Sequence, residues 1–375
     1  MKRLIVAAGG GGDAVAAAML HVALYGDDDE PALILTYSWD RLIVDPVPGP
    51  RSPADFIGLR QLTPHVWAVP GTATMKPPHA ATLPRLAAEL PHTFALIDPY
   101  AGATGITRQL NELIAHFTPE TIDLLDVGGD ILAHGNEPTL RSPLADALTL
   151  AACARTEAPV RLLVAGPGLD GELPTDILRP RLGPLLTTLT PAHAKTISSV
   201  LRWHPSEAAA LLAATAQGAR GLCEVRDAGL LVPLTDDGPT IHQVDLPTAL
   251  ADNRLAQALL DTTGLDEAEQ RCRDICGTSE IDYERTKATR LLSIKATDAD
   301  PTTLRTQLHQ FEETALTRGA THATFRRVAE ALGLNRESRH EMVKFIASAY
   351  PSVWRLSTQP SSTTNERSRT DGEGA

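Results

Sequence analysis

A repeated pattern in the first 170 residues limits the fold more than any other feature of the sequence. A short apolar run ends in glycines and an acidic residue, and a helix-like segment follows. Leu4–Ala8, Ile122–Leu125 and Val160–Ala165 are such runs. Strands that alternate with helices form a parallel sheet with crossover helices, and nearly continuous apolar strands fit a sheet covered on both faces. We therefore expect an α/β fold, a Rossmann-like and mostly parallel sheet with flanking helices, followed by a helical C-terminal segment.

The chain has 375 residues, enough for two domains of about 150 residues or one large domain with additions. We expect an α/β domain over 1–299 and a helical addition over 300–354. The polar, Ser/Thr/Gly-rich stretch 355–375 predicts a disordered tail. A hairpin-like pair of strands is expected around the turn at Asp227–Gly229. The expected C-terminal helices are Pro301–Arg318, His322–Leu332 and Glu337–Ala349.

Charge and composition exclude several classes of protein. The net charge is −12, so the chain lacks the basic footprint of a nucleic-acid-binding protein. Its apolar runs are too short for a signal peptide or a membrane helix, and the spacing of its four cysteines indicates free thiols in a reducing compartment. We expect a cytoplasmic protein with a small-molecule substrate and no nucleic-acid or membrane partner. A homo-oligomer is left open.

The acidic charge also has a consequence for ligands. It gives an anionic ligand no long-range attraction, so such a ligand would need a local binding site. Ligands of parallel sheets bind outside the carboxyl ends of the strands. The Gly/Asp loops all follow strands, so we expect them to gather at that edge.

The loop Gly9–Gly12 follows a strand, and Asp13 opens the next helix. Glycines let a ligand approach the backbone, and a helix N-terminus offers free N–H groups to a phosphate, a carboxylate or a ribose. The loop is not a P-loop, and Ala14 takes the place of the third glycine of a dinucleotide fingerprint. The alternative is a simple helix start with Asp13 as its N-cap.

Among the glycine-rich loops, the segment Asp126–Asp130 gives the strongest indication of a catalytic or metal site. Two carboxylates four residues apart flank Gly128 and Gly129 just after a strand. Paired carboxylates bind a hard divalent cation such as Mg²⁺ or Mn²⁺, or separate in pKa and act as acid and base. We expect Asp126 and Asp130 to do this, although such residues also satisfy turn N–H groups. His134 is the nearest candidate proton carrier.

Other loops supply weaker candidates, and the sequence lacks the HExxH and G-x-S-x-G motifs of zinc proteases and serine hydrolases. The candidate catalytic residues are Asp13, Asp126, Asp130 and His134. The candidate metal ligands are Asp126 and Asp130. The candidate substrate- or anion-binding residues are Gly9, Gly10, Gly11, Gly12, Asp98, Tyr100, Gly128, Gly129, Asn136, Glu137, Gly168, Asp170 and Glu172.

Five segments carry a resemblance to a known family. They are Gly9–Asp13, Asp126–Asp130, Gly135–Glu137, Ser142–Asp146 and Ser279–Arg285. Through them the chain resembles a bacterial and archaeal family named domain of unknown function 1152 over about residues 1–300. The resemblance implies a single α/β domain and brings no established reaction.

Gly128–Gly135 also resembles the GGN-x-[IL]-G-x-G stretch of D-glutamate cyclases, which remove water to form a lactam. Asp130 replaces the family's Asn and His134 replaces its Met. This likeness favours chemistry that adds or removes water.

Three functions are considered. The first is an enzyme of lyase or hydrolase type, including cyclisation, acting on a small polar or anionic metabolite in bacterial metabolism. Its cofactor would be Mg²⁺ or Mn²⁺. The second is an enzyme that binds a nucleotide or dinucleotide on the first glycine loop. The third is a non-catalytic sensor or scaffold.

Overall fold

A computed structural model describes residues 1–226, 229–293, 301–333 and 352–357. Three sequence predictions therefore lie wholly or partly outside the described residues. They are the helix at Glu337–Ala349, the tail from residue 358 onward, and the hairpin turn at Asp227 and Ala228. Among the described residues, no helix has both the length and the apolar character needed to cross a membrane.

The core of the molecule is a nine-stranded sheet in the order β10-β13-β9-β8-β1-β2-β7-β5-β4. The five central strands are parallel, and the strands outside them pair antiparallel. This confirms the predicted α/β fold. The parallel strands are β1 (Arg3–Ala7), β2 (Leu33–Thr36), β7 (Thr93–Leu96), β8 (Thr121–Val127) and β9 (Arg161–Ala165). The antiparallel strands are β4 (Arg60–Thr63), β5 (Val66–Ala68), β10 (Leu185–Thr188) and β13 (Thr240–Val244).

The strand order reverses beside β1. From β1 the chain adds β2 and β7 on one side, then returns to place β8 and β9 on the other. The carboxyl ends of β1 and β8 are therefore the topological switch point, where loops diverge to opposite faces and leave a crevice.

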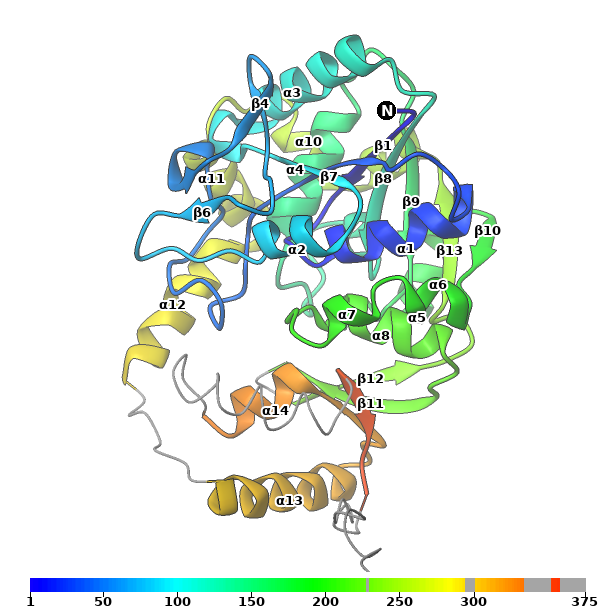
Figure 1. Ribbon diagram of the computed structural model, residues 1–375, viewed down its shortest axis with the longest axis vertical. Coiled ribbons are helices and arrows are strands. Elements are labelled where there is room, and N and C mark those ends of the chain that lie inside the picture. The colour runs from blue at the N-terminus through cyan, green and yellow to red at the C-terminus, as the bar shows by residue number, and fades with distance from the viewer. Residues whose placement is uncertain (227–228, 294–300, 334–351, 358–375) are drawn as a thin grey trace, which may run out of the picture.

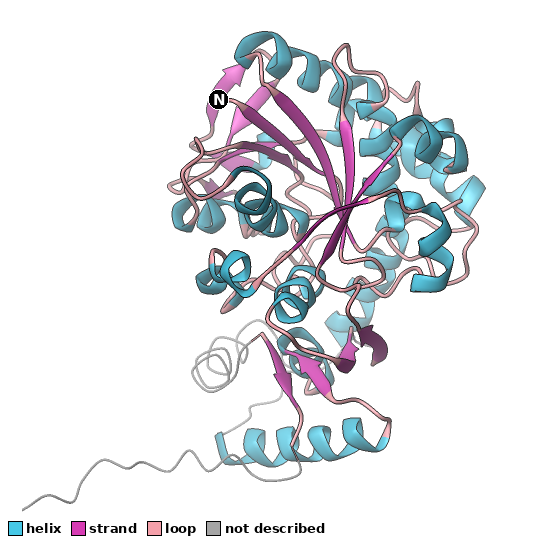
Figure 2. Ribbon diagram, turned by 90° about the vertical axis from the view of Figure 1, so that its right-hand side faces the viewer, coloured by secondary structure: helices cyan, strands magenta, loops and turns pink. Residues whose placement is uncertain are grey.

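Helices cover both faces of this sheet, as Figure 2 shows from the side. Strand residues alternate between two cores, since successive side chains point to opposite faces: Leu4 and Val6 lie in one core, and Ile5 and Ala7 in the other. One face carries α1 (Asp13–Tyr25), α2 (Leu83–Glu89), α6 (Pro191–Lys195), α7 (Ser198–Leu201) and α8 (Glu207–Ala216). The other carries α3 (Gly102–Phe117), α4 (Pro143–Cys153), α9 (Leu246–Asp252), α10 (Arg254–Leu259) and α11 (Leu265–Cys276).

A smaller four-stranded sheet lies beyond the carboxyl edge of the main sheet, at the bottom of Figure 1. Its strands are β12 (Leu230–Leu234), β11 (Gly221–Val225), β14 (His322–Thr324) and β15 (Val353–Arg355), in that spatial order. The expected hairpin is confirmed, because β11 and β12 pair antiparallel. The helices α13 (Pro301–Thr317) and α14 (Phe325–Ala331) pack with this sheet, whereas α12 (Glu280–Ser293) begins against the main core through Ile281. Shorter elements are α5 (Thr175–Leu178), β3 (Phe56–Ile57), β6 (Thr74–Met75) and the 3-10 turns η1 (Pro53–Asp55), η2 (Pro99–Ala101), η3 (Asp130–Leu132) and η4 (Arg179–Arg181).

Two elements of this C-terminal part differ from the prediction. The expected helix at His322–Leu332 begins only at Phe325, because His322–Thr324 pairs in parallel with β11 and Thr324 then caps α14 through the N–H of Arg327 at 3.1 Å. Arg355, expected to begin a disordered tail, ends β15 and pairs with His322. Both differences come from strand pairing with distant segments, which local amphipathicity does not reveal.

Candidate functional site

A cavity opens at the switch point, with about 790 Å³ of empty space including its mouth. The loops after β1, β2, β8 and β9 line it from the main sheet. The start of α8, the end of β11, Glu280 of α12 and Arg326 of α14 line it from the C-terminal side. It therefore lies between the main sheet and the smaller one. Figure 1 shows the smaller sheet below the main one.

The glycine loop after β1 forms one wall. The N–H of Gly9 donates to the carboxylate of Asp13 at 3.0 Å. A Cβ on Gly12 would collide with the side chain of Ser206 at the start of α8, so position 12 has no room for a larger residue. The backbone of the loop therefore binds the neighbouring Asp13 carboxylate, and the Gly9 N–H is not free for a ligand.

Asp13, Asp126 and Asp146 form a first group of carboxylates, which we call the first trio. They come from the start of α1, the end of β8 and the first turn of α4. One oxygen of each lies within 4.8 Å of the others, and all three residues are buried. Asp126 Oδ2 and Asp146 Oδ1 have no hydrogen-bond partner among the described residues. Buried oxygens without donors are costly, so this arrangement favours a bound cation.

Asp130, Asp170 and Glu172 form a second group, the second trio, with one oxygen each within 4.8 Å of the others. Glu172 is well partnered: it accepts from the N–H groups of Arg141 and Ser142 at 2.6 and 3.0 Å, and Arg226 pairs with it at 2.9 Å. Asp170 Oδ2, in contrast, has no partner in the described part of the chain.

Burial and mutual repulsion raise the pKa of most of these groups. Burial raises the pKa of Asp13 to about 7. Burial and the charge of Glu172 raise the pKa of Asp170 to about 7. The pKa of Asp126 is raised well above its usual value by burial and then by Asp13 and Asp170. Burial opposes the ionised form of Glu172, but Arg226 and its other donors outweigh burial and lower its pKa.

Asp130 and Asp146 behave like Asp126. Burial is the main cause that raises the pKa of each well above its usual value. The second cause is the charge of Asp146 for Asp130 and the charge of Asp126 for Asp146. The two trios therefore act on each other and form one acidic floor of the cavity.

Two further carboxyl groups belong to the cavity. Glu280 is buried, its Oε2 has no partner among the described residues, and burial and Glu284 raise its pKa to about 8. With a pKa of about 8, Glu280 holds a proton near neutral pH. Asp40 accepts from the hydroxyl and the N–H of Thr82 at 2.7 and 3.1 Å, and burial raises its pKa to about 6.

Arg226 links the acidic floor to the smaller sheet. Its guanidinium donates to the carbonyl of Asp170 at 2.6 Å and to Glu172 at 2.9 Å. Its backbone has a φ of +59°, a left-handed conformation that costs free energy in a residue with a side chain. The N–H of Arg226 donates to Glu207 at 3.0 Å, which holds this conformation in place.

A family sequence profile, described as protein of unknown function (DUF1152), matches residues 4–288. The chain belongs to this family. No curated protein and no solved structure matches it. The DUF1152 match includes every carboxylate of the two trios and Glu280. It ends before Arg326, the cavity residue of α14.

Within this DUF1152 chain, many of the residues predicted from sequence meet in the cavity. Those that line it are Gly9, Gly10, Gly11, Gly12, Asp13, Asp126, Asp130, Asp170 and Glu172. Gly128 and Gly129 form the turn behind the acidic residues, with φ of +122° and +105°. The Gly128 carbonyl accepts from the N–H of Gly168 at 2.6 Å, so these glycines shape the floor rather than face the cavity.

Other predicted residues lie away from the cavity. The Nδ1 of His134 contacts the carbonyl of Asp252 at 3.0 Å, and Glu137 binds Arg181 at 2.8 Å. Asp98 accepts from the N–H of Tyr100, whose hydroxyl donates to the carbonyl of Pro50 at 3.1 Å. Asn136 is exposed. After Asp130 the chain turns away through η3 towards α9 and α11, so residues close in sequence to the floor are not close to it in space.

Four cavity residues are absent from the candidate site residues predicted from the sequence: Asp146, Glu280, Arg226 and Arg326. The first two lie in segments that carry the family resemblance, which was the available signal. The two arginines come from the hairpin and from α14, and only the folding of the smaller sheet against the main one brings them to the cavity.

Proposed function

We propose that this protein is a divalent-cation-dependent enzyme of the lyase or hydrolase type, acting on a small polar or anionic metabolite at the carboxyl edge of the main sheet. One observation carries the proposal. Two adjacent trios of carboxylates, all buried except the half-buried Asp170, line a cavity, and Asp126, Asp146 and Asp170 each present a buried oxygen with no partner among the described residues.

The donor set is that of a hard cation. Carboxylate oxygens are the usual protein ligands of Mg²⁺ and Mn²⁺, and each trio places three of them within 4.8 Å of one another. So many buried carboxylates repel one another unless protons or cations neutralise them. A structural role alone does not account for this arrangement, because buried charges without partners destabilise a fold.

A bound cation would act as a Lewis acid and lower the pKa of a coordinated water. Residues of the chain support such chemistry from the cavity wall. Glu280, protonated near neutral pH, is suited to donate a proton to a leaving group. Asp13, whose pKa burial raises to about 7 in the absence of a cation, would release its proton when a cation binds the first trio. A proton donor for the leaving group and a water of lowered pKa are what the addition or removal of water needs.

The nucleotide alternative is less well supported. The Gly9 N–H, which would bind a phosphate at the start of α1, already binds the carboxylate of Asp13. A pyrophosphate on this loop would also lie beside the first trio and be repelled by it. The sensor or scaffold alternative leaves the cost of the buried carboxylates unexplained.

Metal binding by the purified full chain tests the proposal. Thermal unfolding is followed with EDTA and with Mg²⁺, Mn²⁺ or Ca²⁺ alone, without any substrate. A cation at about 100 times its Kd adds about 2.7 kcal/mol to the free energy of unfolding. We expect Mg²⁺ or Mn²⁺ to raise the Tm of the wild type and of Asp236→Asn, an exposed control, but not of Asp126→Asn. An unchanged Tm of the wild type with all three cations contradicts the proposal.

A further inference from the structure

A second cavity adjoins the acidic one and is lined by more cationic than anionic side chains. It shares Arg41, Ser142, Glu172, Arg226, Glu280 and Arg326 with the first, so the two are continuous. Its empty space is about 500 Å³ including its opening. Five cationic side chains line it, and we call this region the basic mouth. They are Arg41, Arg141, Arg226, Lys287 and Arg326.

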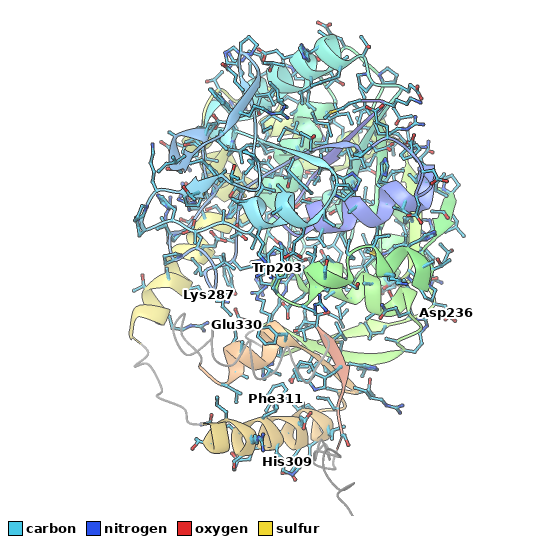
Figure 3. The ribbon with its side chains drawn as sticks, in the orientation of Figure 1. Trp203, Asp236, Lys287, His309, Phe311 and Glu330 are labelled. Atoms are coloured by element: carbon cyan, nitrogen blue, oxygen red, sulfur yellow. The ribbon has the colours of Figure 1, made fainter. Side chains whose placement is uncertain are left out.

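Three of these cations are held by carboxylates of the protein. Arg226 binds Glu172 at 2.9 Å, and Arg326 approaches Glu207 at 3.2 Å. Lys287 of α12 binds Glu330 of α14 at 2.9 Å, and Figure 3 shows these two side chains facing each other across the gap between the helices. These ion pairs hold the side chains of Arg226, Lys287 and Arg326 in place around the basic mouth.

Arg41 and Arg141 differ from the other three. Both are exposed, and neither guanidinium makes an ion pair or a hydrogen bond with a described residue. Their backbones are nevertheless held: the Arg141 N–H donates to Glu172 at 2.6 Å, and the Arg41 carbonyl accepts from Val44 at 2.7 Å. Two guanidinium groups thus extend from fixed backbones at the mouth without a direct hydrogen bond or ion pair to a described residue, and the charge of Arg41 also acts on the carboxyl groups of Glu280 and Glu284.

The acidic floor and the basic mouth favour different chemical groups at the two ends of a substrate. While no cation is bound, the ionised carboxylates of the acidic floor repel an anionic group, and the chain as a whole, with a net charge of −12, does not attract one. The basic mouth reverses the sign locally. Guanidinium groups bind phosphate in a planar, two-pronged geometry, and two of them match the double charge of a phosphoryl group better than the single charge of a carboxylate.

We propose that the substrate carries a phosphoryl group and that this group binds at the basic mouth between Arg41, Arg141 and Arg326. The rest of the substrate then extends over the carboxylates of the acidic floor. This inference rests on the proposed function, whose substrate class it names. Arg326 lies beyond residues 4–288, so a residue outside the family match contributes to substrate choice in this chain.

Calorimetric binding to the full chain tests the proposal, once with EDTA and once with Mg²⁺. The probes are inorganic phosphate, pyrophosphate and glycerol 3-phosphate, with glycerate as the carboxylate comparison. The variant Arg41→Gln/Arg141→Gln removes the two unpaired guanidiniums. The control Arg60→Gln/Arg108→Gln removes the same charge from exposed positions on β4 and α3 that do not line either cavity.

We expect at least one phosphoryl probe to bind the wild type and the control equally, and the mouth variant about tenfold or more weakly, as for the loss of a charge-assisted hydrogen bond. Glycerate is expected to bind more weakly than glycerol 3-phosphate. Three results would overturn the proposal: no phosphoryl probe binds, the control loses as much affinity as the mouth variant, or glycerate binds as tightly.

These binding measurements, taken together with the thermal unfolding of the metal test above, separate this proposal from the proposed function. If phosphoryl binding depends on Arg41 and Arg141 while no cation changes the Tm, the basic mouth is supported and the cation-dependent function fails. If cations raise the Tm but the mouth variant binds phosphoryl probes like the wild type, the function stands and the basic mouth is overturned.

Discussion

The side chain of Asp170 lies directly against the backbone of Gly128, so that a Cβ at position 128 would collide with it. The N–H of Gly168 donates to the carbonyl of Gly128 at 2.6 Å in the same place. The loops after β8 and β9 are therefore packed into one unit. Because Asp126 and Asp130 flank Gly128, this contact sets how the two trios lie relative to each other.

Gly128→Ala is expected to destabilise the protein by about 2 kcal/mol or more, because it adds this collision to the cost of a side chain at φ +122°. Gly218→Ala is the matched control: its φ is +95°, and a Cβ there would meet nothing within 4 Å. Chemical denaturation of both variants measures the difference. Equal losses would show that the contact with Asp170 does not constrain the loop.

Asp126→Asn is expected to raise the Tm of the metal-free protein while abolishing the increase caused by Mg²⁺ or Mn²⁺. The substitution removes a buried, repelled carboxylate and supplies amide donors to its neighbours. Gains of stability on loss of a site residue are a known trade-off. Calorimetry with EDTA and with Mn²⁺ checks both halves. A lower metal-free Tm would assign Asp126 a structural role instead.

The metal-free protein is expected to lose stability as pH rises from about 6.5 to about 8.5. The pKa values of Asp13 and Asp170 are raised to about 7 and that of Glu280 to about 8, against about 4 in the unfolded chain. Between those limits the folded state binds more protons, so its stability falls as pH rises. Burial lowers the pKa of His204 to about 3, so this histidine makes stability rise with pH. That rise is largely complete by pH 6.5, where the histidine of the unfolded chain has lost most of its charge.

Calorimetry at pH 6.5, 7.5 and 8.5 with EDTA measures this slope. Asp13→Asn is expected to flatten it. With Mg²⁺ present the increase in Tm should grow with pH, because the cation binds ionised carboxylates. A metal-free Tm that rises over this range would contradict the assigned pKa directions.

The stability of the segment that contains α13 and β14 is expected to depend on Glu224, whose side chain is fully buried. Arg318 donates to its two oxygens at 2.8 and 2.9 Å, and Arg327 approaches at 3.5 Å. Glu224→Gln removes the buried charge that Arg318 and Arg327 approach, so it should increase hydrogen exchange in α13 and β14. Arg220→Gln, which breaks the surface pair with Asp236, should cost under about 1 kcal/mol. Equal protection in both variants would show that this network does not hold the segment.

Local pattern predicted a large part of this fold. The apolar runs became the central parallel strands, because a short run rich in Leu, Val and Ile that ends in glycine has few other ways to bury itself. Carboxylates at the end of such a run or in the short loop after it, such as Asp126 and Asp170, lie in the cavity because a strand delivers its last residues to the sheet edge.

Local pattern did not predict the positions of residues further from the strand ends. His134 is four residues from Asp130 but lies outside the cavity, whereas Glu280 and Arg326 are far away in sequence and line it. The path of a loop and the docking of β14 on β11 depend on contacts with distant segments, which a local pattern does not encode.

The sequence by itself determined the class of the fold, the edge at which the acidic loops meet and the family of the chain, since strand periodicity and loop composition are local properties. Only the tertiary structure decided that the acidic residues divide into two trios and that a basic mouth faces them. Both depend on packing between remote elements, where burial and charge act through space rather than along the chain.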